Sequence, residues 1–356
     1  MPIHIFVERL GAVGRPLVIQ NYRIENLMPI DKKIRNRWIQ RLGIPLAAIP
    51  IIWIYWRLDF HSMITMLPKV AWWTTPVLFS FVISCMTLQG VRWWILLHAF
   101  IPELPLKRAL AYHFMGIFYG TAIPTGVAQD VIKTLFVAQK NSMETSWAAF
   151  WVTRALGLPA LAILSMIGFF SMDKSALPRG WEYALALFYL LVGIVFFISF
   201  SKRITRPVRI IVEKWFSPKV MLPVEKIRES IYRYRQKKTA VLQGFMVTLV
   251  AQIGLIMLTC LTIKGITGSF FIWECFTFIP IIELLAVSFP FTPNGIGARE
   301  ALSAAFFAYL HLSKEHLGIY VMFALFFSLV PRLLGFPLLI HGYRKKRATA
   351  NEYIYR

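Results

Sequence analysis

The chain has 356 residues, of which 57% are apolar, and a formal net charge of +22. Several apolar runs are longer than about 18 residues, which excludes an ordinary soluble globular protein and predicts an all-α integral membrane protein. The basic residues cluster beside these runs, so anionic lipid headgroups explain the charge and no nucleic acid is expected as a partner.

Residues 1–41 are polar and basic and are predicted to form a cytoplasmic or interfacial arm. The first membrane half is assigned to 42–201, with a re-entrant hairpin at 107–140. In that hairpin two segments too short to cross flank a Pro/Gly turn; the alternative is one kinked span with a tail. The predicted spans of this half are 42–56, 71–97, 142–171 and 181–200.

A basic cytoplasmic linker is predicted at 202–238, because the segment is rich in Lys and Arg and contains few carboxylates. The second membrane half follows at 239–343, with a second re-entrant hairpin at 270–311, and a basic cytoplasmic tail ends the chain at 344–356. The predicted spans of this half are 240–263 and 319–340. With both termini in the cytoplasm, every dense basic segment lies on the cytoplasmic side of a cytoplasmic membrane.

Two local patterns occur twice in the chain. TRALGLP at 153–159 and PRLLGFP at 331–337 each contain an arginine followed by Gly at +3 and Pro at +5. Upstream, IPTGVAQD ends at Asp130 and TPNGIGAR ends at Arg299, each with a charge four residues after a Gly. The chain is therefore predicted to be an inverted-topology repeat with about six transmembrane helices and two re-entrant hairpins.

Arg154 and Arg332 are predicted to lie near the middle of the bilayer. A charge there costs between about 2.5 and more than 10 kcal/mol, so each arginine needs a partner or a cavity. In a structural interpretation they hydrogen-bond the carbonyls of the hairpin turns or pair with Glu283 and Asp130. In a functional interpretation they bind an anionic headgroup, and the sequence leaves both open.

The hairpin turns are a second candidate for binding an anion. Gly126, Gly295 and Gly297 lie just before predicted helices, where free backbone N–H groups and the helix dipole favour phosphate.

Charged residues flank both turns and one lies deep in the second hairpin. Asp130, Lys133, Arg299 and Glu300 are interpreted either as a mixed-sign network or as ordinary surface ion pairs. Glu283 is the one carboxylate deep in its segment, and is either a proton-coupling site or, as we favour, the partner of one arginine.

Motifs for catalysis are absent from the sequence. There is no HExxH, no paired Cys/His spacing, no G-x-S-x-G and no Asp-rich magnesium site, so no enzyme activity, metal or cofactor is expected. Cys85, Cys260 and Cys275 lie in apolar runs and are expected to pack in the core. His113 and Tyr119, in the first hairpin, are expected to be packing or interface residues and not ligands.

The motifs PNGIGARE at 293–300 and IPTGVAQDVIK at 123–133, with the two arginine spans, resemble the flippase-like membrane domain of lysylphosphatidylglycerol synthases. The resemblance covers about residues 42–343. It implies movement of a lipid between leaflets, including aminoacylated phosphatidylglycerol, and in stand-alone members other lipid or polyprenyl-linked substrates. The chain departs from the family in lacking a synthase domain, so aminoacyl transfer is not expected, and in having Ala128 and Gln129 where the family often has glycine.

The function expected from these observations is translocation of an anionic phospholipid or a polyprenyl-phosphate-linked lipid. The alternatives are a membrane enzyme or synthase subunit that binds a polyprenyl-phosphate lipid for group transfer, and a lipid-binding assembly factor without turnover. The expected partner is a membrane lipid with an anionic headgroup. The oligomeric state is left open, with a homodimer among the states allowed.

Overall fold

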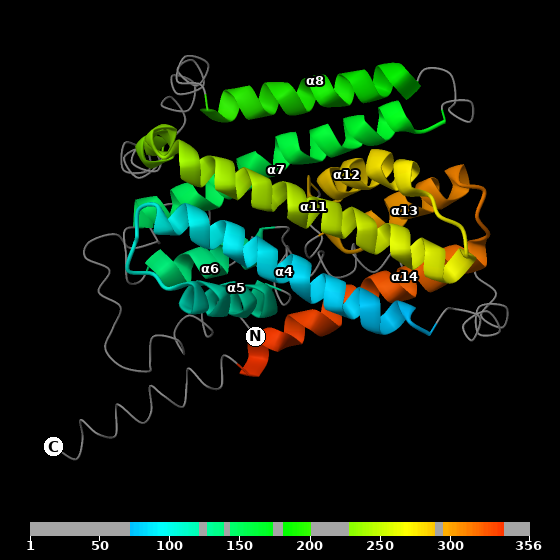
Figure 1. The fold of residues 1–356 in the computed structure, drawn as a ribbon, viewed down its shortest axis with the longest axis horizontal. Helices are drawn as coiled ribbons and strands as arrows, with labels where there is room; N and C mark the ends of the chain where they lie inside the picture. The colour runs from blue at the N-terminus through cyan, green and yellow to red at the C-terminus, as the bar shows by residue number, and fades with distance from the viewer. Residues whose placement is uncertain are drawn as a thin grey trace, which may run out of the picture.

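The computed structural model describes residues 72–120, 127–138, 143–173, 181–200, 228–288 and 295–337, and every regular element in these ranges is helical (Figure 1). The prediction of an all-α membrane protein is confirmed. The predicted arm at 1–41, the first span at 42–56, most of the basic linker and the tail at 344–356 lie outside the described residues.

Four helices in the described ranges are long and apolar enough to cross a membrane. At 1.5 Å per residue, the 30 residues of the longest extend for about 45 Å, more than the hydrocarbon thickness. The helix α8 (Trp181–Phe200) is also apolar, and the total of six spans stays a prediction. The four long helices are α4 (Thr74–His98), α7 (Met143–Ser171), α11 (Lys238–Thr267) and the stretch Lys314–Pro337, which begins with α14 (Lys314–Leu329).

Two pairs of short helices occupy the positions of the predicted hairpins. In the first, α5 (Leu106–Gly120) and α6 (Ala128–Ala138) pack side by side (Figure 1). Gly120 lies against Gln129 and Gly116 lies against Lys133, so the two helices run antiparallel. One kinked span with a tail, the alternative for this segment, is therefore wrong.

The second pair consists of α12 (Ile272–Ser288) and α13 (Ala298–Tyr309). The ring of Phe278 lies 5.6 Å from that of Phe306, and Glu283, later in α12, contacts Arg299, earlier in α13, which makes this pair antiparallel too. That the chain enters and leaves the membrane on one side at each pair stays a prediction.

Each short pair packs against a helical element from the other half of the chain. α12 lies along α7, where Ser165 Oγ donates a hydrogen bond of 2.7 Å to the carbonyl of Thr277. On the other side, α5 contacts the 3-10 helix η5 (Val330–Leu334), and a Cβ at the following Gly335 would collide with the carbonyl of Phe114. α4 and α11 pack along each other between these two contacts.

The two arginine motifs have different backbone conformations. TRALGLP lies inside the continuous helix α7, whereas most of PRLLGFP forms the 3-10 helix that follows α14. The physical reason is Pro331, which has no N–H to continue the α-helical ladder and stands where the first motif has Thr153. The predicted span 319–340 is therefore not one uninterrupted α-helix.

The aromatic residues near the end of α4 differ from the interfacial belt that their position suggests. Trp93 is completely buried, in a core cluster with Leu96 and Leu97, and the Nε1 of Trp94 donates to the carbonyl of Leu104. Tyr234, in the 3-10 helix η3 (Tyr234–Gln236), covers this end of α4 and donates to the carbonyl of Leu96. The position of these tryptophans near a helix end suggests the membrane interface, but it does not reveal that η3 packs over them. The three cysteines are free and buried, as expected for core packing.

Candidate functional site

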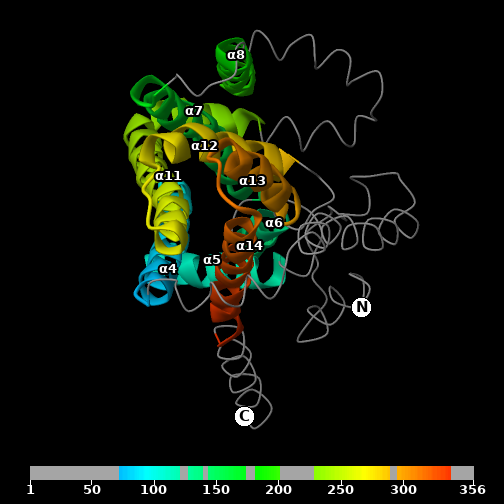
Figure 2. The same cartoon turned by 90° about the vertical axis from the view of Figure 1, so that its right-hand side faces the viewer.

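A cavity of about 610 Å³ lies among the helices of both halves. Figure 2, turned by 90° from Figure 1, shows the helices of both halves arranged in a ring, with α8 outside it. Polar groups face this cavity from α4, α6, α7, α11, α12, α13, α14 and η5, while aliphatic side chains make up much of the remaining wall. The charged residues that line the cavity are Arg92, Asp130, Arg154, Glu283, Arg299 and Arg332.

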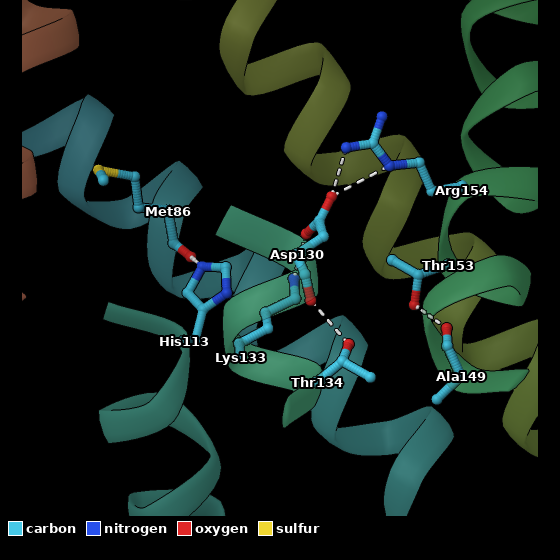
Figure 3. Close-up of polar contacts among 8 residues, drawn as sticks. All are labelled: Met86, His113, Asp130, Lys133, Thr134, Ala149, Thr153 and Arg154. Carbon is cyan, nitrogen blue, oxygen red and sulfur yellow. Dashed lines mark hydrogen bonds and ion pairs between the residues drawn. The ribbon is translucent and has the colours of Figure 1, made fainter. Parts of the chain in front are cut away.

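The first charged cluster is centred on Asp130, in the first turn of α6 (Figure 3). Its Oδ2 accepts hydrogen bonds from Nε of Arg154 at 3.0 Å and from Nη2 at 2.5 Å. Its Oδ1 lies 2.6 Å from Nζ of Lys133, whose side chain is 4% exposed. One carboxylate therefore neutralises a buried lysine behind the cavity wall and also holds the arginine that lines the cavity.

His113 lies behind this cluster and has a packing role. Its Nε2 lies 2.9 Å from the carbonyl oxygen of Met86, and the contact joins α5 to α4 (Figure 3). Its side chain is buried and does not line the cavity, which agrees with the expectation for this residue.

The second charged cluster is an ion pair across the second helix hairpin. Nε of Arg299 lies 2.6 Å from one oxygen of Glu283, and Nη2 donates to the other oxygen at 2.9 Å. The partner of Glu283 is thus neither of the two arginines predicted to lie near the bilayer centre. The physical reason is that α12 and α13 run antiparallel, which brings these two side chains opposite each other.

The turn before α13 is stabilised by a side chain of that helix, Glu300. Gly295 and Gly297 have φ values of 78° and 89°, conformations that favour glycine, and the N–H of Gly297 donates to Oε2 of Glu300 at 2.6 Å. Both glycines are buried, and neither they nor Glu300 lines the cavity. Gly126, in the corresponding first turn, lies outside the described residues.

The predicted mixed-sign network is thus two separate groups, one for each hairpin. The alternative of ordinary surface ion pairs is wrong, because the side chains of Asp130 and Lys133 are 14% and 4% exposed and Glu300 is buried.

Arg332 differs from the other arginines of the cavity. Its side chain is buried, its Nη2 donates to Ser328 Oγ at 3.2 Å, and within the described ranges it has no carboxylate partner. In the matching motif Arg154 has Asp130 as its partner. The two motifs therefore bring one neutralised and one uncompensated guanidinium to the same cavity.

The family model described as lysylphosphatidylglycerol synthase TM region matches residues 40–335. The chain belongs to this family. The match confirms the resemblance drawn from the motifs, and it places the protein among membrane domains linked to lipid handling. Among curated proteins and among solved structures, no match to the chain was found.

The departure of this family member at Ala128 and Gln129 has a structural counterpart. A Cβ at Gly120 would lie 2.6 Å from the backbone nitrogen of Gln129, and one at Gly116 would lie 2.8 Å from its carbonyl oxygen. The close approach of the two hairpin helices thus depends on glycines of α5, and the side chain of Gln129 is left to line the cavity.

Arg92 is the main cavity residue that the sequence analysis did not select as a candidate. Its Nε is buried and has no hydrogen-bond partner among the described residues. A signal was present in the sequence, since Gln89 and Arg92 lie three residues apart on one face of an apolar helix. Gln252 and Thr259 repeat it at a spacing of seven on α11, and all four residues line the cavity.

Proposed function

We propose that this protein translocates a lipid with an anionic headgroup between the leaflets of the cytoplasmic membrane. The observation that carries the proposal is the cavity between the two halves, whose wall, in the part of the chain that the structure describes, contains four arginines and two carboxylates. Guanidinium groups bind phosphate through charge-assisted, often bidentate hydrogen bonds. A cationic chamber inside an apolar helix bundle suits a phosphate that must pass the middle of the bilayer.

The cavity also reaches the outer surface of the bundle. Trp151 of α7 and Val195 of α8 belong to its wall and are 54% and 50% exposed. Aliphatic residues such as Leu158 and Leu161 line the neighbouring part. A lipid bound with its phosphate at the arginines would extend its acyl chains between α7 and α8 into the bilayer, so the headgroup moves without exposing the chains to water.

The proposed movement is a rocking of one half against the other around a central site, as in transporters built from inverted repeats. The distribution of basic segments supports cytoplasmic termini in a cytoplasmic membrane.

The test is leaflet exchange of a fluorescent anionic phospholipid in vesicles containing the purified full-length chain. We expect exchange above that of protein-free vesicles, and a loss of about tenfold or more in Arg332→Ala and Arg154→Ala, since each removes a charge-assisted contact. Arg108→Ala is the matched control, because Arg108 is exposed on α5 and lies outside the cavity.

Three outcomes decide among the functions considered. Exchange that is lost in both cavity variants, with unchanged thermal unfolding, supports translocation. Chemical modification of a polyprenyl-phosphate lipid without exchange supports a membrane enzyme. Binding of the lipid without exchange or product supports an assembly factor, and it rejects the proposed function.

A further inference from the structure

The charges around the cavity do not balance. Of the residues that the structure describes, four arginines and two carboxylates line it, which leaves an excess of two positive charges. The two buried charges directly behind the wall, Lys133 and Glu300, cancel each other and leave the excess unchanged. The hairpin turns at 121–126 and 289–294 contain no Asp or Glu, so they supply no further carboxylate.

The excess resides on two particular residues. Arg154 is paired with Asp130, and Arg299 with Glu283. Among the described residues, Arg332 donates to the hydroxyl of Ser328 and has no carboxylate partner, and the Nε of Arg92 is buried without a hydrogen-bond partner. A buried cation that has no carboxylate partner, or that shares one with other cations as Arg92 shares Asp130, is costly in an apolar bundle, so an anion bound in the cavity would stabilise it.

We propose that the cavity selects a lipid whose headgroup ends in a phosphomonoester or a diphosphate and that Arg332 binds its phosphate, with Arg92 adding positive charge to the same cavity. The inference rests on the proposed function and specifies its substrate. A terminal phosphate carries a charge of about −1.5 to −2 at pH 7, which matches the excess. A phosphodiester such as phosphatidylglycerol supplies one negative charge, phosphatidylcholine supplies no net charge, and an aminoacylated phosphatidylglycerol adds positive charge to a positive chamber.

Of the two arginines, Arg332, in the second half, is expected to make the stronger contact with the phosphate. Arg332 is 7% exposed and is held by the 3-10 helix, whose following Gly335 packs on α5. A guanidinium fixed in this way loses little side-chain entropy when it binds a phosphate. The phosphate is therefore bound first and most tightly at Arg332 in the conformation described here.

The experiment measures binding apart from transport. The purified full-length chain, in detergent, is titrated with phosphatidic acid, a polyprenyl phosphate, phosphatidylglycerol, phosphatidylcholine and lysylphosphatidylglycerol, and bound lipid is counted by native mass spectrometry. We expect the two phosphomonoester lipids to bind at least about tenfold more tightly than phosphatidylglycerol, with the last two weaker still. Equal binding of phosphatidylglycerol, or tighter binding of the aminoacylated lipid, overturns the proposal.

Variants locate the selectivity. Arg332→Gln is expected to reduce phosphomonoester binding by about 10- to 100-fold with little effect on phosphatidylcholine, Arg332→Lys to retain part of it, and Arg92→Gln to lower it less. Arg108→Gln is the matched control and is expected to bind as the unmodified chain does. Loss of selectivity in the control, or its retention in both cavity variants, overturns the assignment, and the unmodified chain tests the charge rule even if a variant does not fold.

The two proposals fail in different ways. Selective binding of phosphomonoester lipids without leaflet exchange supports the headgroup inference and rejects translocation. Exchange of all five lipids at similar rates supports translocation and rejects the headgroup inference. Binding of phosphatidic acid without the polyprenyl phosphate, or the reverse, supports the charge rule and identifies the lipid chain that the bundle accepts.

Discussion

Asp130 accepts hydrogen bonds from Nε and Nη2 of Arg154 on a single oxygen, Oδ2, while its other oxygen, Oδ1, lies 2.6 Å from Nζ of Lys133. One acidic residue is thus the counter-ion of two cations that come from different helices. In the second half the corresponding position is Arg299, and the acid is supplied by α12. Each hairpin thus contributes to one pair of an arginine and a carboxylate. The residue at the start of the second hairpin helix is the acid, Asp130, in the first half and the arginine, Arg299, in the second half.

Asp130→Asn is expected to lower the free energy of unfolding by about 3–5 kcal/mol, because Lys133 and Arg154 both lose their counter-charge in a buried place. Arg154→Gln leaves the pair between Asp130 and Lys133 intact and should cost less. Thermal unfolding of the purified variants checks the order. Equal stability of Asp130→Asn and the unmodified chain would show that the carboxylate is not needed by the two cations.

The ion pair of Glu283 and Arg299 is expected to tolerate the exchange of both charges better than the reversal of one of them. Glu283→Arg and Arg299→Glu each place like charges opposite each other, whereas the double variant restores a pair. A double-mutant cycle on unfolding should give a coupling free energy of about 3 kcal/mol or less, clearly different from zero. If the two single effects simply add, Glu283 has a role other than holding Arg299, and proton coupling becomes the better interpretation.

Gly157→Leu is expected to block lipid movement without destabilising the protein. Gly157 lines the cavity, and a Cβ built on it meets nothing within 4 Å, so a larger side chain would extend into the open space. Gly193→Leu on α8 is the matched control, since its Cβ also meets nothing within 4 Å but it does not line the cavity. Leaflet exchange and thermal unfolding are measured together. Normal exchange in Gly157→Leu would place the lipid path elsewhere.

Gly335→Ala is expected to separate the 3-10 helix from the first hairpin. A Cβ at this position would collide with the carbonyl of Phe114 and lie 2.6 Å from the Cβ of Phe118. Overpacking of this kind costs about 1–3 kcal/mol, and it should also displace Arg332 and weaken phosphomonoester binding. Gly193→Ala, with open space around its Cβ, should leave unfolding and binding unchanged. The two properties are followed by thermal unfolding and native mass spectrometry.

The helices were predictable because their signals are local. Apolar runs and Pro/Gly turns lie within one segment, so the bounds of α4, α7, α8 and the two hairpins follow from the sequence to within a few residues. The end of α14 was missed although Pro331 marks it, because the surrounding hydropathy is unbroken. The proline, which cannot continue the α-helical hydrogen bonds, determines the end of α14, and the average hydropathy of the segment does not.

The pairing of charges was less predictable because it depends on which helices pack together. Asp130 and Arg154 were among the pairs considered, and they do pair. Glu283 pairs with Arg299 because of the antiparallel hairpin, a relationship that residue spacing does not contain. The place of Arg92 in the cavity depends likewise on α11 and η3 covering the end of α4, which buries the tryptophan beside it.

The exchange of partners between halves, with α12 on α7 and η5 on α5, also determines the order in which the chain can be completed during synthesis. The first hairpin is made early, but its packing surface on η5 emerges from the ribosome some 200 residues later, roughly 10–40 s at ordinary elongation rates. Until then only the face of α5 that packs on η5 lacks its partner, because α4 and α6 are already made. A nascent chain that stops before Val330 would thus leave this face of the first hairpin unpaired, a form that quality-control proteases can recognise.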